Sequence, residues 1–171
     1  MREIKIAICG PGRAGKDTAA EYLAELLRLK YTAGTSLWAA GLVYEYFQKH
    51  APGKYVSKRD CWHDRHNHRT LWAQVIGDYN RDDPVALYRD CLSGQDFLVG
   101  LRWRHEQQAC KAAKLCDLWI YVDRPGCDDD TNQIKPEDCD FVICNYGTLE
   151  QFEEKLRNLA NVLRAIHVCD P

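Results

Sequence analysis

Four short apolar segments alternate with helical patterns along the chain. They cover residues 4–9, 97–99, 118–122 and 141–144, are rich in β-branched or aromatic residues, and are bounded by turn residues. Between them, apolar side chains recur at helical spacing, so that each group shares one helix face. The groups are Ala19, Leu23, Leu26 and Leu27; Leu71, Val75, Ile76 and Tyr79; and Leu149, Phe152, Leu156 and Leu159. Strands alternating with helices predict an α/β fold with a parallel sheet flanked by helices.

Two short motifs mark helix starts. Thr148 can cap the last helix, while Gln151, three residues later, reaches back to the amide of the cap. Asp83 followed by Pro84 marks another start.

Residues 35–92 are almost wholly helical in pattern and separate the first strand and its helix from the second strand. They therefore predict a helical insertion.

Length, charge and cysteine content limit the possible classes of protein. With 171 residues the chain suits one domain, residues 1–171. No apolar run approaches a membrane span, and no signal peptide precedes the first strand, so we expect a soluble, cytoplasmic protein without membrane partners. A net charge of −2 argues against binding nucleic acid by bulk electrostatics, although a local basic patch remains possible. The odd number of cysteines, nine, indicates reduced and mostly buried thiols.

A glycine-rich motif follows the first strand and opens a helix. Its residues are Gly10, Pro11, Gly12, Arg13, Ala14, Gly15, Lys16, Asp17 and Thr18. Such glycines let successive backbone N–H groups converge on a phosphate, and the lysine neutralises the β and γ oxygens. The usual hydroxyl after the lysine is replaced by Asp17, with Thr18 one place later, so we expect these two residues to meet Mg²⁺ directly or through water. The motif predicts that residues Gly10, Gly12–Thr18 bind ATP.

Three segments together resemble the bacteriophage deoxynucleoside monophosphate kinases. They are the Gly-Lys-Asp-Thr loop at residues 15–18, the Asp-Phe-Leu-Val-Gly-Leu-Arg strand at 96–102, and the segment at 139–150 that contains Asn145-Tyr-Gly-Thr-Leu-Glu. The resemblance implies a P-loop nucleoside-kinase fold, an acceptor-binding role for the insertion, a lid-like loop at residues 124–138, and Asn145 at the border of the adenine site. It also implies that the protein is located in the cytoplasm of a phage-infected bacterium. One departure is Gly100-Leu101-Arg102, where such kinases often carry Asp-Val-Arg.

Candidate acceptor and catalytic residues follow predicted strands. Arg102 and Arg124 each come after a strand, at the carboxyl edge where open α/β sheets bind ligands, and Arg104 lies nearby. Arginines suit phosphoryl transfer because the protein mainly positions two substrates and offsets charge. Asp123 is a candidate for orienting an acceptor hydroxyl. Solvation at the surface is the alternative for each arginine.

The stretch from residue 54 to 72 concentrates bases, imidazoles and indoles, with a local charge of +3. Trp62 and Trp72 could sandwich a base while Arg65 or Arg69 holds a phosphate. A polar helix face with Trp62 in the core is the alternative. A zinc site made by Cys61, His63, His66 and His68 is disfavoured, because His68 would lie away from the face shared by His63 and His66.

The sequence therefore predicts an ATP- and Mg²⁺-dependent kinase acting on a deoxynucleotide. The acceptor is either a free deoxynucleoside monophosphate or a 5-hydroxymethyl pyrimidine, such as 5-hydroxymethyluracil, within DNA. A dephospho-CoA kinase-like enzyme and a non-catalytic ATP-binding module, the latter motivated by Gly100, stay open as alternatives. The oligomeric state is left open.

Overall fold

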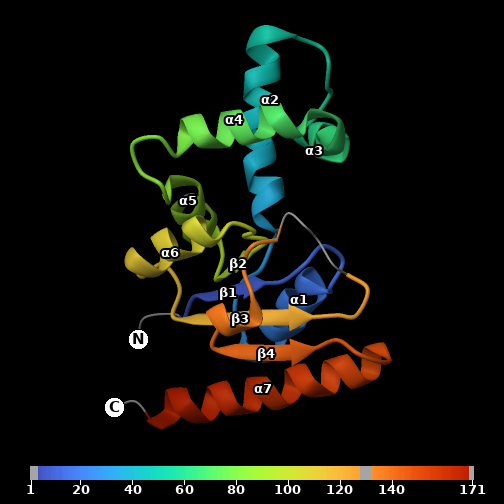
Figure 1. Cartoon of the computed structure of the whole chain (residues 1–171), viewed down its shortest axis with the longest axis vertical. Helices are drawn as coiled ribbons and strands as arrows, with labels where there is room; N and C mark the ends of the chain where they lie inside the picture. Colours follow the sequence, from blue (N-terminus) through green and yellow to red (C-terminus); the bar gives the residue numbers. More distant parts are fainter. Residues whose placement is uncertain (1–3, 128–131, 170–171) are drawn as a thin grey trace.

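The computed structural model describes residues 4–127 and 132–169 (Figure 1). Its strands are β1 (Ile6–Cys9), β2 (Phe97–Val99), β3 (Leu118–Asp123) and β4 (Phe141–Cys144). Its α-helices are α1 (Lys16–Leu27), α2 (Thr35–His50), α3 (Lys58–His63), α4 (Arg69–Tyr79), α5 (Ala86–Gly94), α6 (Arg104–Ala112) and α7 (Leu149–Cys169). Two 3₁₀ turns, η1 (Asp64–His68) and η2 (Pro136–Asp138), join them.

The strands form one parallel sheet in the order β2-β1-β3-β4, which confirms the predicted α/β class and all four predicted strands. β1 lies inside the sheet, with Ile8 opposite Val99 on one side and Ile120 on the other. Because all strands are parallel, their carboxyl ends meet at one edge of the sheet. The glycine-rich loop, residues 10–15, leaves β1 at that edge.

Side chains of the strands alternate between two hydrophobic clusters, one on each face of the sheet. Ala7, Leu98 and Trp119 belong to the cluster that packs against α2, α5 and α6. Ile8 and its neighbours on the other face pack against α1 and α7. Figure 1 shows α7 running along the sheet on the side opposite α5 and α6. The sheet is thus covered by helices on both faces.

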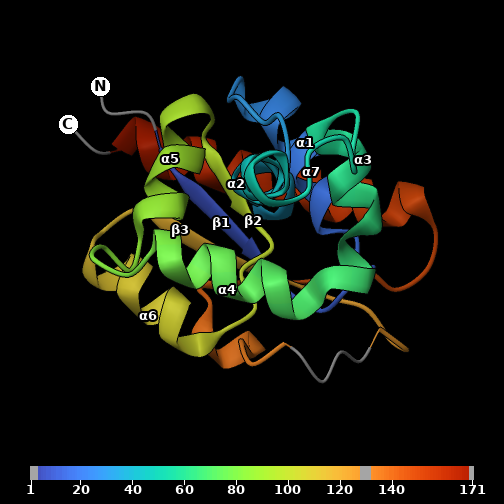
Figure 2. The same ribbon diagram turned by 90° about the horizontal axis from the view of Figure 1, so that it is seen from above.

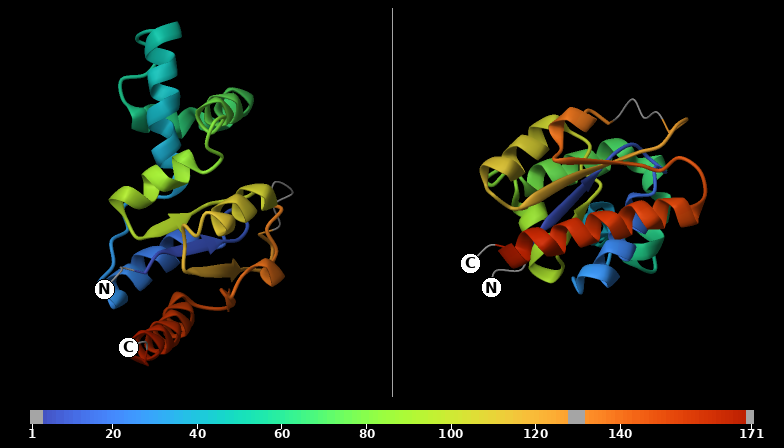
Figure 3. Two further views of the ribbon diagram at one scale, coloured as in Figure 1. Left: turned by 90° about the vertical axis from the view of Figure 1, so that its left-hand side faces the viewer. Right: turned by 90° about the horizontal axis from the view of Figure 1, so that it is seen from below.

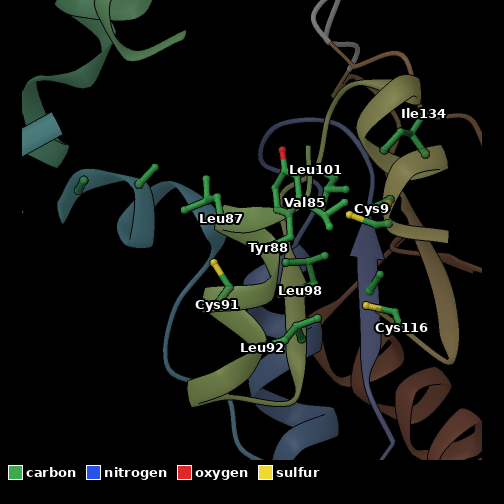
Figure 4. Close-up of a cluster of buried hydrophobic side chains, with 14 of the residues drawn as sticks. Cys9, Val85, Leu87, Tyr88, Cys91, Leu92, Leu98, Leu101, Cys116 and Ile134 are labelled. Carbon is green, nitrogen blue, oxygen red and sulfur yellow. The ribbon is translucent and has the colours of Figure 1, made fainter. Parts of the chain in front are cut away.

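Residues 35–94 supply α2 to α5, and α2 extends away from the sheet (Figure 3, left). Seen from above, α3 and α4 lie beside α2 (Figure 2), and each of them contacts α2. α5 returns to the sheet, where Leu87, Tyr88 and Cys91 lie near Leu98 of β2 (Figure 4). We call α2, α3, η1 and α4 the helical lobe; it shares one hydrophobic cluster with the sheet.

The helix starts and faces agree with the sequence in part. Thr148 and Gln151 form the predicted capping box, with distances of 3.0 Å and 3.3 Å for the two reciprocal bonds. Of the face predicted for α4, Leu71, Val75 and Ile76 pack against the hydrophobic cluster, whereas Tyr79 is 42% exposed and Trp72 is the buried residue of the helix. Tyr79 instead donates a hydrogen bond from its hydroxyl to Asp90 of α5. A polar partner at the end of α4 thus replaces the expected apolar contact.

Two further observations concern cysteines and membranes. Eight cysteines in residues 4–127 and 132–166 are free thiols, and five of them, including Cys9, are buried. Among the described residues, every helix is too short or too polar to span a bilayer.

Candidate functional site

The glycine-rich loop has a backbone that only glycine adopts easily at two positions. Gly10 has φ +134° and Gly15 has φ +100°. A Cβ on Gly10 would lie 2.4 Å from the carbonyl oxygen of Val122, and one on Gly15 would lie 2.7 Å from Nδ2 of Asn145. The loop therefore needs glycine both for its dihedral angles and for close packing against β3 and Asn145. Arg13, with φ +61°, completes the curl.

Lys16 and Asp17 open α1 directly after the loop. Lys16 Nζ donates to the carbonyl oxygen of Pro11 at 2.5 Å, so its side chain folds back over the loop. Asp17 Oδ1 accepts a hydrogen bond from the Tyr31 hydroxyl at 2.5 Å. Burial, followed by the bond to Asp17, raises the pKa of Tyr31. The hydroxyl therefore stays protonated and acts as a donor to the carboxylate.

A cavity of about 420 Å³, which we call the loop cavity, opens beside the loop. From the loop and α1 it is lined by Gly12, Arg13, Lys16 and Asp17, and from the segment after α1 by residues 31–37. Across from these lie Trp62 and Arg65 of the helical lobe, and Val99, Gly100 and Arg102 at the carboxyl end of β2. Besides residues of the glycine-rich loop, the cavity therefore brings together five predicted site residues. They come from three parts of the chain and are Lys16 and Asp17, Trp62 and Arg65, and Arg102.

Positive charge gathers around this cavity. Burial and the neighbouring guanidinium groups of Arg102 and Arg69 lower the pKa of Arg65. Arg65 is the main cause of a lowered pKa at His66, with burial and the charges of Arg69, Arg102 and Arg13 contributing as well. Arginines from the loop, the lobe and the end of β2 thus act on one imidazole. Such a convergence of positive charge attracts anions.

The two tryptophans line different cavities, so the structure does not bring Trp62 and Trp72 together as the base sandwich requires. Arg65 stacks on the Trp62 ring, 4.1 Å from its centroid, and donates to the Trp62 carbonyl oxygen at 2.9 Å. Trp62 Nε1 donates to Ser36 Oγ at 3.0 Å, which anchors the indole to α2. Trp72 is buried in the hydrophobic cluster of the lobe and does not line the loop cavity.

Several other candidates do not line the loop cavity. Arg104 pairs with Asp138 at 2.8 Å. Arg69 contacts His66 Nδ1 at 3.3 Å, and Thr18 is exposed on α1. Arg124 donates from Nη1 to the carbonyl oxygen of Arg13 at 3.4 Å, next to the loop but outside the cavity.

Asp123 and Asn145 lie at the carboxyl ends of β3 and β4. The Asp123 carboxylate accepts a hydrogen bond from the Tyr146 hydroxyl, and this bond is the first cause that raises the pKa of Tyr146 to about 12. Asn145 donates from its backbone N–H to the Asp123 carbonyl oxygen at 2.7 Å, and from Nδ2 to that of Ala14 at 2.8 Å. Asn145 therefore links the end of β4 to Ala14 of the glycine-rich loop.

Gly100 stands where the kinases named in the sequence analysis often carry aspartate, and the backbone at this position favours glycine. Its φ is +104°, and a Cβ would lie 3.2 Å from Thr35 Oγ1. Thr35 Oγ1 in turn donates to the Val99 carbonyl oxygen at 3.0 Å. A side chain at position 100 would be strained and would crowd this bond.

Sequence reasoning missed Tyr31, Thr35 and Ser36, which all line the loop cavity. Tyr31 lies between α1 and α2, outside any periodic pattern, and meets Asp17 only through the path of the chain. Ser36 contacts a residue 26 positions later. No local signal in the sequence identifies such contacts.

Among residues 4–127 and 132–166, no three His, Cys, Asp or Glu side chains converge as a metal-binding group. His68 Nε2 lies 3.1 Å from Asp64 Oδ2 and 2.8 Å from Lys54 Nζ.

Of the expected lid at residues 124–138, residues 128–131 lie outside the described residues.

No protein-family model matches the chain, and no curated protein matches its sequence.

Proposed function

We propose that the chain is an ATP-dependent P-loop kinase that transfers the γ-phosphoryl group to a deoxynucleotide acceptor. The observation that carries this proposal is the loop cavity, where Lys16 and Asp17 face Arg65 and Arg102 across about 420 Å³. In phosphoryl transfer the protein has to hold two substrates in line and offset charge on the transferred group. A donor bound by the loop and an acceptor bound by the arginines would meet in this space. The parallel sheet with helices on both faces is compatible with a P-loop nucleoside-kinase fold.

The donor half of the site is the glycine-rich loop with Lys16. Backbone N–H groups of the loop and the start of α1 provide a cradle for phosphate oxygens. Lys16, which donates to the Pro11 carbonyl oxygen, would turn toward the β and γ oxygens when ATP binds. The exposed carboxylate of Asp17 fits Mg²⁺, which prefers oxygen ligands and would supply charge neutralisation on the phosphates.

The acceptor half is formed by Arg65 and Arg102, with Trp62 beside them. Both arginines are suited to phosphate oxygens, and Arg13 and Arg69 add to the local positive potential. An acceptor phosphate needs no base at neutral pH because its oxygens are already largely ionised. An acceptor hydroxyl, as in 5-hydroxymethyluracil within DNA, would need a carboxylate, which position 100 does not provide.

The test is transfer of labelled γ-phosphate from ATP in the presence of Mg²⁺. Each deoxynucleoside monophosphate, DNA containing 5-hydroxymethyluracil and dephospho-CoA are offered in parallel, with Lys16→Ala as the inactive control. Label on a mononucleotide supports a nucleotide-pool kinase, and label within DNA supports a DNA-modifying kinase of the phage type. Label on dephospho-CoA alone would replace the proposed acceptor. No label on any acceptor, with ATP still bound, would favour a non-catalytic ATP-binding module, the second candidate suggested by Gly100.

A further inference from the structure

A second cavity, of about 170 Å³, adjoins the loop cavity; we call it the inner cavity. The two cavities share Thr35, Ser36, Gly100 and Arg102 as lining residues, so they meet at the carboxyl end of β2. The other walls come from α2, α4, α5 and α6 and from Leu101 and Trp103. They are mainly apolar and aromatic, from Ala39, Trp72, Ile76, Leu87, Tyr88 and Trp103. A hydrophobic cavity of about 150 Å³ is large enough for one benzene ring.

Glu106, in the first turn of α6, is the carboxylate of the inner cavity. Burial raises the pKa of Glu106, and hydrogen bonds from the Tyr88 side chain and from the backbone of Trp103 and Arg102 partly offset that rise. Tyr88 projects from α5, with its hydroxyl beside Leu101 (Figure 4). A carboxylate offers about four acceptor positions, so Glu106 can also accept a hydrogen bond from a ligand.

A donor complements this acceptor on another wall. Trp72 is only 7% exposed, and its indole N–H finds no acceptor among the described residues. A buried donor without a partner is costly, and a carbonyl oxygen on a bound ring would relieve that cost. The inner cavity therefore offers flat apolar walls, one acceptor position and one orphaned donor.

We propose that the inner cavity binds the base of the acceptor, that this base is a pyrimidine, and that Glu106 selects it by accepting a hydrogen bond from a ring N–H. The inference rests on the proposed function, since Arg102 at the shared mouth would hold the acceptor phosphate while the ring enters the inner cavity. The imide edge of thymine or uracil carries an N–H beside carbonyl oxygens, which matches Glu106 and Trp72. Glu106 is thus a specificity-determining residue for the same site.

The test is calorimetric titration without ATP, using dTMP, its N3-methyl derivative and dGMP. A site built around a substrate N–H rejects an analogue that lacks it, so N3-methylation is expected to weaken binding to the wild type by about 10-fold or more. dGMP is expected to bind at least as weakly as the methylated ligand. In Glu106→Gln the side-chain oxygen can still cap α6, and the amide N–H₂ turns toward the ring, so dTMP falls to the level of the methylated ligand. Glu154→Gln, on an exposed position of α7, is the matched control and keeps the wild-type ratio.

Three outcomes would overturn the inference: N3-methylation without effect, dGMP binding as tightly as dTMP, or an unchanged ratio in Glu106→Gln. These binding results are independent of catalysis. A chain that selects dTMP through Glu106 but transfers no phosphate keeps this inference and loses the proposed kinase activity. Conversely, a chain that phosphorylates purine acceptors and binds the N3-methylated ligand as tightly as dTMP keeps the proposed kinase activity and loses this inference.

Discussion

Asn145 Nδ2 donates to the carbonyl oxygen of Ala14 at 2.8 Å, and the same amide would lie 2.7 Å from a Cβ on Gly15. The end of β4 thus packs against the glycine-rich loop without space for a methyl group. This contact joins residues 131 positions apart in the sequence. The shape of the loop therefore depends on the far end of the sheet as well as on its own glycines.

Gly15→Ala tests this packing. The alanine must adopt φ near +100° and displace Asn145, so we expect the free energy of unfolding to fall by about 1–3 kcal/mol. Gly41→Ala is the control, because Gly41 lies within α2 with nothing within 4 Å of its added Cβ. That change should raise the free energy of unfolding by roughly 0.5–1 kcal/mol. Chemical denaturation measures both, and equal effects at the two glycines would contradict the packing argument.

Arg102 and Arg104 form a matched pair on either side of the cavity boundary. Arg102 lines both cavities, whereas Arg104 pairs with Asp138 outside them. If Arg102 holds phosphate, Arg102→Gln should lower kcat/KM by about 100-fold or more. Arg104→Gln breaks a half-exposed ion pair and should change it by less than about 3-fold. Steady-state kinetics on the acceptor found by the transfer assay gives the comparison, and a larger loss in Arg104→Gln would exclude the assignment.

If Asp17 binds Mg²⁺ as proposed, the Tyr31 hydroxyl competes with the metal ion for the carboxylate. Because its hydroxyl donates to the carboxylate at 2.5 Å, Mg²⁺ has to share or displace that bond. Tyr31→Phe should therefore tighten Mg²⁺ binding by roughly 3- to 10-fold. Calorimetry with a non-hydrolysable ATP analogue provides the measurement. Tyr22→Phe, which removes a hydroxyl bonded to Arg157 at 2.7 Å, is the control and should leave Mg²⁺ affinity unchanged.

His66 reports on the arginines of the loop cavity. Arg65, burial and three further arginines hold its pKa below the ordinary value of about 6.5, so the unfolded state binds more protons in the window below that value. Stability should accordingly fall as the pH drops through this window, and His66→Gln should remove that part of the fall. Arg65→Gln should raise the pKa of His66.

Pyrophosphate offers a second test of the same imidazole. An anion bound among the arginines offsets their charge, so pyrophosphate should raise the pKa of His66 in an NMR titration. The resonance is identified by its absence in His66→Gln. If pyrophosphate does not change the pKa of His66, the anion does not bind near Arg65.

The sequence was sufficient for the strands and for the position of the glycine-rich loop between β1 and α1. Each strand is a short apolar segment with clear turn residues on both sides, and the capping box at Thr148 involves only residues three apart. The first strand begins at Ile6 rather than residue 4, and the third ends at Asp123 rather than 122. Local patterns of this kind carry their own signal.

The parts that failed depend on contacts between distant segments. Leu71 and Trp72 both fit a helical face at the 3.6-residue period, and only packing against the lobe decides that Trp72 is the buried one. In the sequence, Glu106 is only a polar residue at the start of a helix. Its position in the inner cavity depends on how α6 packs near Tyr88 of α5. Tyr31 and Ser36 reach the loop cavity through the same long-range geometry.

The backbone at Gly100 also limits how this chain can evolve. A glycine codon is one base away from an aspartate codon, yet at φ +104° the new side chain would strain the turn and press on Thr35. An acidic residue here would be tolerated more readily after changes in the turn and at the start of α2. Selection can therefore alter the charge of the site more readily through residues around position 100 than through position 100 itself.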